Sequence, residues 1–263
     1  MKKGSLAVVG TGYLAAGHVT AESQTLIESA EKCLYMVADP AAEAWIRQLN
    51  ATAESLKGCY APGKPRLDSY REMVERMLTP VRQGLDVCAV FYGHPGVFAF
   101  PPHEAIRQAR AAGFEARMFP GVSAEDCLFA DLGLDPAIHG CQSFEATDFL
   151  VHQRRFDPTS NLILWQAGGI GVATYEREDL WSRSGLRVLA EVLLQHYPAG
   201  HQAVVYEAAV YPVCDPLILH VPLGKLAEAR VSVISTLYLP PLRTAPLDLD
   251  MLDRLGISRP SPG

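Results

Sequence analysis

An aromatic side chain and an imidazole stand in a glycine-rich segment, Phe91-Tyr92-Gly93-His94-Pro95-Gly96-Val97-Phe98, directly after an apolar run that is typical of a buried strand. In parallel α/β sheets, small molecules bind outside the carboxyl ends of the strands, and glycines there let the backbone approach a ligand closely. The segment is therefore either a ligand-binding loop or a tight turn whose side chains only pack. His94 could be a base, but a binding contact is favoured because no nearby serine or cysteine offers it a nucleophile.

A second group with possible chemistry is Tyr60, Arg66 and Tyr70. A phenol with an ordinary pKa of about 10 is a poor base at neutral pH, but a neighbouring guanidinium can lower a pKa by about 1–3 units. Tyr70 beside Arg66 could then accept a proton. The alternative is that Tyr70 packs in the apolar stripe of a helix, while Tyr60 and Arg66 lie on a loop surface.

The first glycines form a rival ligand motif. Gly10-Thr11-Gly12-Tyr13-Leu14-Ala15 matches a dinucleotide-binding fingerprint, and Asp39 lies where a ribose-binding acid would be expected. The match is imperfect, because the next helix is expected to start near Thr20, which makes a long turn for a pyrophosphate site. This segment could equally be a wide strand-to-helix turn.

Other polar positions have simpler explanations. Glu125 and Asp126 stand in the expected first turn of a helix, where carboxylates complement the helix dipole, and Asp131 follows in the same helix; we interpret all three as structural. Residues 166–169, Gln-Ala-Gly-Gly, end another expected strand, so their backbone could form the opposite wall of a crevice.

Composition excludes several classes of protein. With 263 residues, 49% hydrophobic and 20% charged, the chain can bury a substantial core. Its net charge of −6 and the absence of a lysine and arginine cluster argue against nucleic-acid binding.

No apolar run reaches the roughly 20 residues that a membrane helix needs, and the start of the chain does not resemble a signal peptide. We expect a cytoplasmic protein. The six cysteines are scattered without a C-x-x-C pair, so neither a disulfide framework nor a metal site is predicted.

Periodicity predicts an α/β fold of two lobes. Strands are expected at 5–9, 33–38, 87–91 and 115–119, and helices at 20–32, 41–49, 102–112 and 124–132, the last with a capping box from Ser123 to Asp126. Residues 57–65 are expected to form a long exposed loop, followed by a helix capped by Asp68 and ended by Gly84.

The second lobe should have more antiparallel character. Its expected strands are 161–166, 203–208, 217–221 and 231–239, with an amphipathic helix at 186–197. The predicted lobes are 1–119 and 120–245, and residues 246–263 form a short tail.

Three motifs carry a family resemblance. They are Tyr-Gly-His-Pro-Gly-Val-Phe at 92–98, the run Met-Phe-Pro-Gly-Val-Ser-Ala-Glu-Asp-Cys-Leu-Phe-Ala-Asp-Leu at 118–132, and Gln-Ser-Phe-Glu-Ala-Thr-Asp-Phe at 142–149. Together they resemble the tetrapyrrole-methylase superfamily and, more closely, the borosin peptide backbone N-methyltransferases, over roughly residues 4–245. The resemblance implies a class III methyltransferase fold with the cofactor cleft between two lobes. The Gly10 and Gly12 turn would then shape the cleft floor without binding a dinucleotide.

The resemblance implies S-adenosylmethionine as methyl donor, with S-adenosylhomocysteine as product, and a peptide-bond nitrogen as acceptor. By motif position the cofactor contacts would be Tyr92, Gly93, His94, Val97, Ser123, Ala124, Gln166, Ala167, Tyr206, Ala208 and Thr236. The catalytic residues of the family fall on Tyr60, Arg66 and Tyr70, whereas one further family tyrosine is replaced by Lys57.

The fungal members of the family carry their substrate in a C-terminal extension, which we do not find in residues 246–263. We therefore expect a separate precursor peptide supplied in trans, and the resemblance also implies a homodimer. Two alternatives stay open. One is a methyltransferase of the same fold acting on a tetrapyrrole or another small acceptor. The other is a non-catalytic cofactor-, peptide- or nucleotide-binding module that uses Gly10, Gly12 and Asp39.

Overall fold

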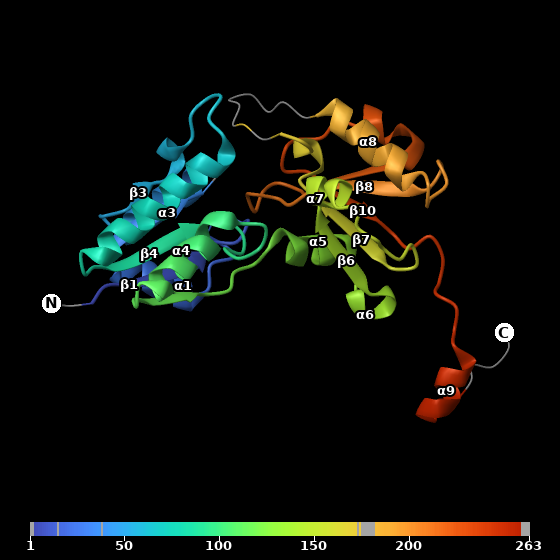
Figure 1. The fold of residues 1–263 in the computed structure, drawn as a ribbon, viewed down its shortest axis with the longest axis horizontal. Helices are drawn as coiled ribbons and strands as arrows, with labels where there is room; N and C mark the ends of the chain where they lie inside the picture. The colour runs from blue at the N-terminus through green and yellow to red at the C-terminus, as the bar shows by residue number, and fades with distance from the viewer. Residues whose placement is uncertain (1–2, 15, 38, 173, 175–181, 259–263) are drawn as a thin grey trace.

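The computed structural model describes residues 3–14, 16–37, 39–172, 174 and 182–258. They form two α/β lobes, each built on its own five-stranded sheet, which confirms the predicted fold class. Figure 1 shows the two lobes side by side, joined by the segment that leads into helix α5. Ala15 and Ala38, which belong to the predicted fingerprint and to a predicted strand, lie outside the described residues.

The sheet of the first lobe is entirely parallel, in the order β3-β2-β4-β1-β5. Helices α1 and α2 cover one face, where Ile27 and Ile46 are fully buried, and α3 and α4 cover the other, where Met77 and Ala105 are fully buried. The elements are β1 (Ser5–Gly10), α1 (Ala21–Ser29), β2 (Lys32–Met36), α2 (Pro40–Leu49), β3 (Glu54–Ser55), the 3-10 turn η1 (Lys57–Cys59), α3 (Arg66–Arg82), β4 (Asp86–Phe91), α4 (Phe100–Ala111) and β5 (Glu115–Met118).

The sheet of the second lobe is mixed, in the order β6-β7-β10-β8-β9, with only β6 and β7 parallel. Helix α8 packs on one face and α5 on the other. The elements are α5 (Ala124–Leu132), α6 (Pro136–His139), β6 (Cys141–Glu145), α7 (Ala146–Val151), β7 (Asn161–Trp165), η2 (Ala167–Gly169), α8 (Arg183–Leu193), β8 (Gln202–Glu207), β9 (Leu217–Pro222), η3 (Leu223–Glu228), β10 (Thr236–Leu239) and α9 (Leu249–Leu255). Helix α9 extends away from both lobes in Figure 1.

Most predicted elements are present, and the differences have local causes. The capping box at Ser123 and Asp126 is formed. Helix α3 begins at Arg66, with Pro65 as its N-cap, so the prediction that Asp68 caps it was wrong. Asp68 instead lies in the first turn of the helix, where its carboxylate complements the helix dipole. The predicted strand 231–239 shortens to β10, since Ser232 and Ser235 close a turn instead.

Three glycine-bearing turns meet at the carboxyl edge of the first sheet, because β4, β1 and β5 are neighbours. Gly12 and Gly93 exchange backbone hydrogen bonds of 3.2 and 2.9 Å between the first turn and the loop after β4. A Cβ on Gly10 would lie 2.3 Å from the Gly93 carbonyl oxygen, and one on Gly121 would lie 2.9 Å from the same atom. These backbones therefore pack directly on one another. In the described part of the chain, no helix has the length and apolar character needed to cross a membrane.

The close packing at Gly10 gives a stability prediction. Gly10→Ala should lower the free energy of unfolding by at least about 1–3 kcal/mol, because backbone atoms rather than a movable side chain occupy the space of the new methyl group. Gly200→Ala is the matched control, since a Cβ there meets nothing within 4 Å. Urea unfolding of both variants measures the difference, and equal stabilities would contradict the packing argument.

Candidate functional site

A cavity opens between the lobes beside these turns, and we call it the loop cavity. Ten of the eleven residues predicted as cofactor contacts line it, from Tyr92 in the first lobe to Thr236 in the second. Ala167 is the exception: it is 2% exposed and its N–H donates to the Ser235 carbonyl oxygen at 2.9 Å. The other lining residues, which were not predicted, are Tyr13, Phe98, Trp165, Glu207, Val210 and Ile234.

His94 is held by its own loop. The N–H of Gly96 donates to Nδ1 of His94 at 2.9 Å. An accepting Nδ1 leaves the proton of the neutral ring on Nε2. The imidazole is therefore oriented as a hydrogen-bond donor at Nε2, which suits the predicted binding contact better than general-base chemistry.

A second cavity adjoins the first and contains all three predicted catalytic side chains; we call it the tyrosine cavity. Tyr60, Arg66 and Tyr70 line it, and the Tyr60 and Tyr70 rings stand edge to face with centroids 6.4 Å apart. Tyr70 also stacks on Phe100 at 6.1 Å. Thus the tyrosine that looked like part of an apolar helical stripe both packs against the core and faces a cavity.

Helix α3 explains how Arg66 and Tyr70 come together. Residues four apart lie on the same helix face, so both reach the tyrosine cavity from consecutive turns. A cation in the first helical turn opposes the helix dipole, so helix stability does not account for Arg66. Among the residues that the structure describes, its Nε atom is buried without a hydrogen-bond partner. A buried unsatisfied donor is unfavourable, which makes a ligand acceptor at this position expected.

Two phenols at the cavities, those of Tyr60 and Tyr92, are biased towards their neutral forms. Burial raises the pKa of Tyr60 well above its ordinary value; nearby Tyr70 adds to the rise and Arg66 opposes it. Although the Tyr92 side chain is 44% exposed as a whole, desolvation of its hydroxyl likewise raises its pKa, again with Tyr70 adding and Arg66 opposing. Tyr60 and Tyr92 are therefore hydrogen-bond donors at neutral pH rather than bases.

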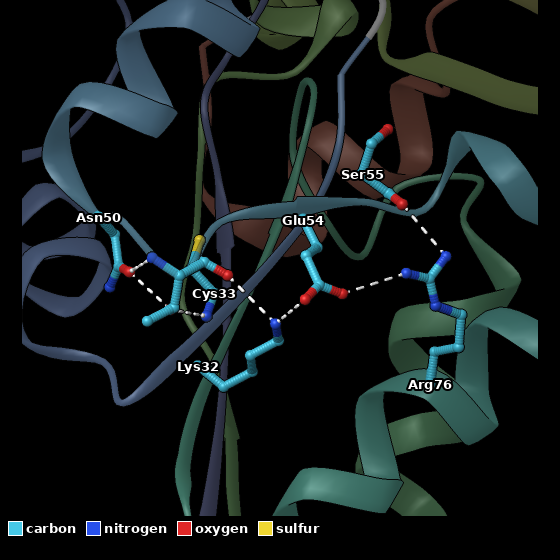
Figure 2. A network of polar contacts seen from close by, with 7 residues as sticks. Lys32, Cys33, Asn50, Glu54, Ser55 and Arg76 are labelled. Carbon is cyan, nitrogen blue, oxygen red and sulfur yellow. Dashed lines mark hydrogen bonds and ion pairs between the residues drawn. The ribbon is translucent and has the colours of Figure 1, made fainter.

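Two ion-pair braces hold the Tyr60 loop against α3. Arg76 of α3 donates to the Ser55 carbonyl oxygen at 3.1 Å, lies 3.4 Å from a Glu54 carboxylate oxygen and contacts Cys59 Sγ at 3.8 Å. Figure 2 shows this network continuing from Glu54 to Lys32. On the other side of the loop, Lys64 donates to the Cys59 carbonyl oxygen at 2.8 Å and pairs with Glu72 of α3. The braces fix the loop that carries Tyr60 to the helix that carries Arg66 and Tyr70.

Five residues line both cavities and so form the junction between them: Tyr92, His94, Val97, Phe98 and Gln166. Phe98 and Gln166 have left-handed backbones, with φ of 50° and 57°. This conformation costs a non-glycine residue roughly 1–3 kcal/mol. The sequence places Phe98 in the candidate ligand loop but does not single it out, because a phenylalanine before a helix is an ordinary core candidate. Its position between the cavities identifies it as a site residue.

Two other predicted features lie away from the cavities. The Asp39 carboxylate accepts from the Ala42 N–H at 2.7 Å and caps α2, so it does not occupy a ribose-binding position. Lys57 pairs with Glu43 of α2 at 3.6 Å and is not among the described residues that line the tyrosine cavity. The lysine thus joins a surface ion pair.

Comparison with known proteins gives a family match. The model of the tetrapyrrole (corrin/porphyrin) methylases matches residues 5–227. A solved uroporphyrin-III-C-methyltransferase from Thermus thermophilus has a TM-score of 0.64 at 17% identity, covering 98% of this chain and 99% of its own. A solved cobalt precorrin-4 methyltransferase has a TM-score of 0.61 at 16% identity, covering 90% and 94%. These two similarities concern the fold alone.

Curated fungal proteins are more similar in sequence. The methyltransferase and gymnopeptide precursor of Gymnopus fusipes is 45% identical over 97% of this chain and 61% of its own length. The corresponding dendrothelin A protein of Dendrothele bispora is 45% identical over 95% and 61%. The omphalotin A protein of Omphalotus olearius is 44% identical over 97% and 62%. The chain therefore spans about three fifths of the length of these relatives.

The Arg76 brace predicts the mobility of the Tyr60 loop. Arg76→Met should make the amides of Cys59 and Tyr60 exchange hydrogen about tenfold faster, because losing a charge-assisted hydrogen bond costs roughly 1.5 kcal/mol. Arg71→Met is the control, since Arg71 of the same helix pairs only with nearby Asp68 at 3.2 Å. Hydrogen exchange with mass spectrometry compares the exchange rates in the two variants. Unchanged exchange at Cys59 and Tyr60 in Arg76→Met would show that the brace is dispensable.

Proposed function

Because the chain belongs to the tetrapyrrole methylase family, we propose that it is an S-adenosylmethionine-dependent methyltransferase whose acceptor is a backbone amide nitrogen of a peptide. The observation that supports a peptide amide as acceptor is the tyrosine cavity. Its lining includes Tyr60, Arg66 and Tyr70, and it adjoins the loop cavity. The relatives with the highest identities quoted above are, by their names, methyltransferases joined to peptide precursors.

The loop cavity fits the proposed methyl donor better than a dinucleotide. Among its described lining residues there is no lysine or arginine, and Glu207 contributes a carboxylate. Such a lining favours a ligand with positive charge over one carrying phosphates. The residues that would hold the donor are the ten predicted contacts that line this cavity, and the donor supplies an electrophilic methyl group on its sulfonium.

The tyrosine cavity suits an amide acceptor. An amide nitrogen is weakly nucleophilic because its lone pair is delocalised into the carbonyl group. Charge therefore has to develop on the carbonyl oxygen as the nitrogen becomes reactive. The Nε of Arg66, which has no hydrogen-bond partner in the described part of the chain, is a donor suited to that oxygen. Tyr70, as a phenolate stabilised by Arg66, would take the amide proton, directly or through water, and become a neutral phenol, while neutral Tyr60 orients the peptide.

Placement supplies another part of the rate enhancement. Holding the nitrogen about 3–3.5 Å from the methyl carbon and in line with the sulfur can contribute several kcal/mol. The two cavities join at Phe98 and Gln166, so an acceptor in one and a donor in the other would meet at that junction.

The acceptor peptide, in this proposal, is a separate chain bound in trans. The described residues that line either cavity end at Thr236, so the described part of this chain after that residue does not fill the site. A homodimer, as implied by the family resemblance, is part of the same proposal, and sedimentation of the purified protein tests it.

Tyr70→Phe should abolish methylation of a co-expressed candidate precursor peptide, with a fall in rate of about 100-fold or more, because the proton acceptor is lost while the ring remains. Affinity for S-adenosylmethionine should be retained. Intact mass spectrometry of the peptide measures the outcome as steps of about 14 Da, the mass of CH₂ added by each methylation, and fragmentation places each step on the backbone or on a side chain.

Tyr197→Phe is the matched control for that experiment. Its hydroxyl is buried without a partner in the second lobe, outside both cavities, so its removal should leave methylation unchanged. Methylation retained in Tyr70→Phe would refute the assignment of the proton acceptor. Absence of any mass shift in peptides treated with the wild type, alongside methylation of a small acceptor, would favour the small-acceptor alternative.

The raised pKa of Tyr60 gives a pH prediction. Because burial raises that pKa above its ordinary value, the Tyr60 hydroxyl stays protonated from pH 6 to pH 9 and contributes no ionisation in that window. Tyr60→Phe should therefore lower the methylation rate by about tenfold or more, as expected for a lost positioning hydrogen bond, without altering the shape of the pH–rate profile. A change of shape between pH 6 and pH 9 would mean that Tyr60 itself titrates during the reaction.

A further inference from the structure

Phe98 has a position that burial in the hydrophobic core does not explain. It is 46% exposed, and its backbone is in the left-handed region at φ 50°, which is unfavourable for a bulky side chain. A phenylalanine that contributed only to the core would be buried and unstrained. The surrounding structure holds this ring in the space between the lobes.

A contact with the second lobe fixes the ring. The Phe98 and Trp165 ring centroids are 5.5 Å apart, with an interplanar angle of 40°. Trp165 is itself 5% exposed, and its indole N–H donates to the Ser143 hydroxyl at 2.6 Å. Phe98 therefore rests on a rigid partner across the cleft and forms one side of the junction. Gln166, the other left-handed residue there, approaches from the second lobe.

We propose that the face of Phe98 contacts the positively charged sulfonium of the methyl donor and selects it over the neutral thioether product. The inference rests on the proposed function, because methyl transfer from one cavity to the other places the reacting sulfur at their junction. Phe98 lines both cavities, as do Tyr92, His94, Val97 and Gln166, none of which carries a fixed charge.

The physical basis is the quadrupole of the aromatic ring. A cation within about 6 Å of a ring centroid is attracted to the electron-rich face, most strongly where water is excluded. The sulfonium has this charge and the thioether does not, whereas the rest of the two molecules is the same. The ring thus increases the affinity for the donor before methyl transfer but not the affinity for the product afterwards. This difference assists the exchange of product for donor.

The test is the ratio of dissociation constants for S-adenosylhomocysteine and S-adenosylmethionine, measured by calorimetry without any acceptor. Phe98→Leu keeps an apolar side chain but removes the ring, and should lower this ratio by about three- to tenfold. Phe98→Tyr keeps an aromatic face and should retain the wild-type ratio.

Phe100→Leu is the matched control, because Phe100 is similarly exposed at 44% but lines only the tyrosine cavity. Its ratio should equal that of the wild type. If Phe98→Leu weakens both ligands equally, or if Phe100→Leu lowers the ratio as much, the proposal is overturned, since the ring then provides only volume. Melting temperatures of all three variants verify that they fold.

These outcomes separate the inference from the proposed function. A wild type that binds neither ligand contradicts both the proposed donor and the role of Phe98. A wild type that binds the donor with an unchanged ratio in Phe98→Leu contradicts the role of Phe98 alone. A lowered ratio together with no methylation of peptide amides supports the role of Phe98 and contradicts only the proposed acceptor.

Discussion

The direct packing of three glycine turns at the edge of the first sheet is the constraint on which the rest of the site depends. Gly10, Gly93 and Gly121 lie at or just beyond the ends of three adjacent parallel strands. Their backbones approach so closely that a methyl group on Gly10 or Gly121 would collide with the Gly93 carbonyl oxygen. Hydrogen bonds between Gly12 and Gly93 tie two of these turns together. Since the turns cannot move independently, the loop from Tyr92 to Phe98 has one path, and that path forms the wall shared by both cavities.

The second lobe completes the site from the opposite side, and it does so with side chains at the ends of its strands rather than with glycine turns. Its sheet is mostly antiparallel, and it contributes Trp165, Gln166, Tyr206 and Thr236 from the ends of β7, β8 and β10. Tyr206 is held by a 2.7 Å hydrogen bond from its hydroxyl to Asp131, so this carboxylate has a structural role, as the sequence predicted. This hydrogen bond fixes the cavity wall on the side of the second lobe, as the backbone packing of the glycine turns fixes it on the side of the first.

Family membership and chemistry rest on different observations in this protein. The solved tetrapyrrole methyltransferases share the fold at 16–17% identity, which says nothing about the acceptor. The acceptor proposal depends instead on the braced loop and helix that bring two phenols and an incompletely satisfied guanidinium to one cavity. Similarity to the fungal proteins that are named as methyltransferases and cyclic peptide precursors adds to that local argument, because those proteins match 95–97% of this chain.

The sequence by itself determined the α/β class, the capping box at Ser123 and the set of loops that could bind a ligand, because hydrophobic periodicity and capping are local properties. It also placed Arg66 and Tyr70 four residues apart. It could not decide whether Tyr70 faces a core or a cavity, since both are compatible with an apolar helical stripe, and it did not single out Phe98 within its loop, or Trp165, as a residue of the site. Those depend on which distant segments become neighbours, which only the packing of two sheets against each other's loops decides.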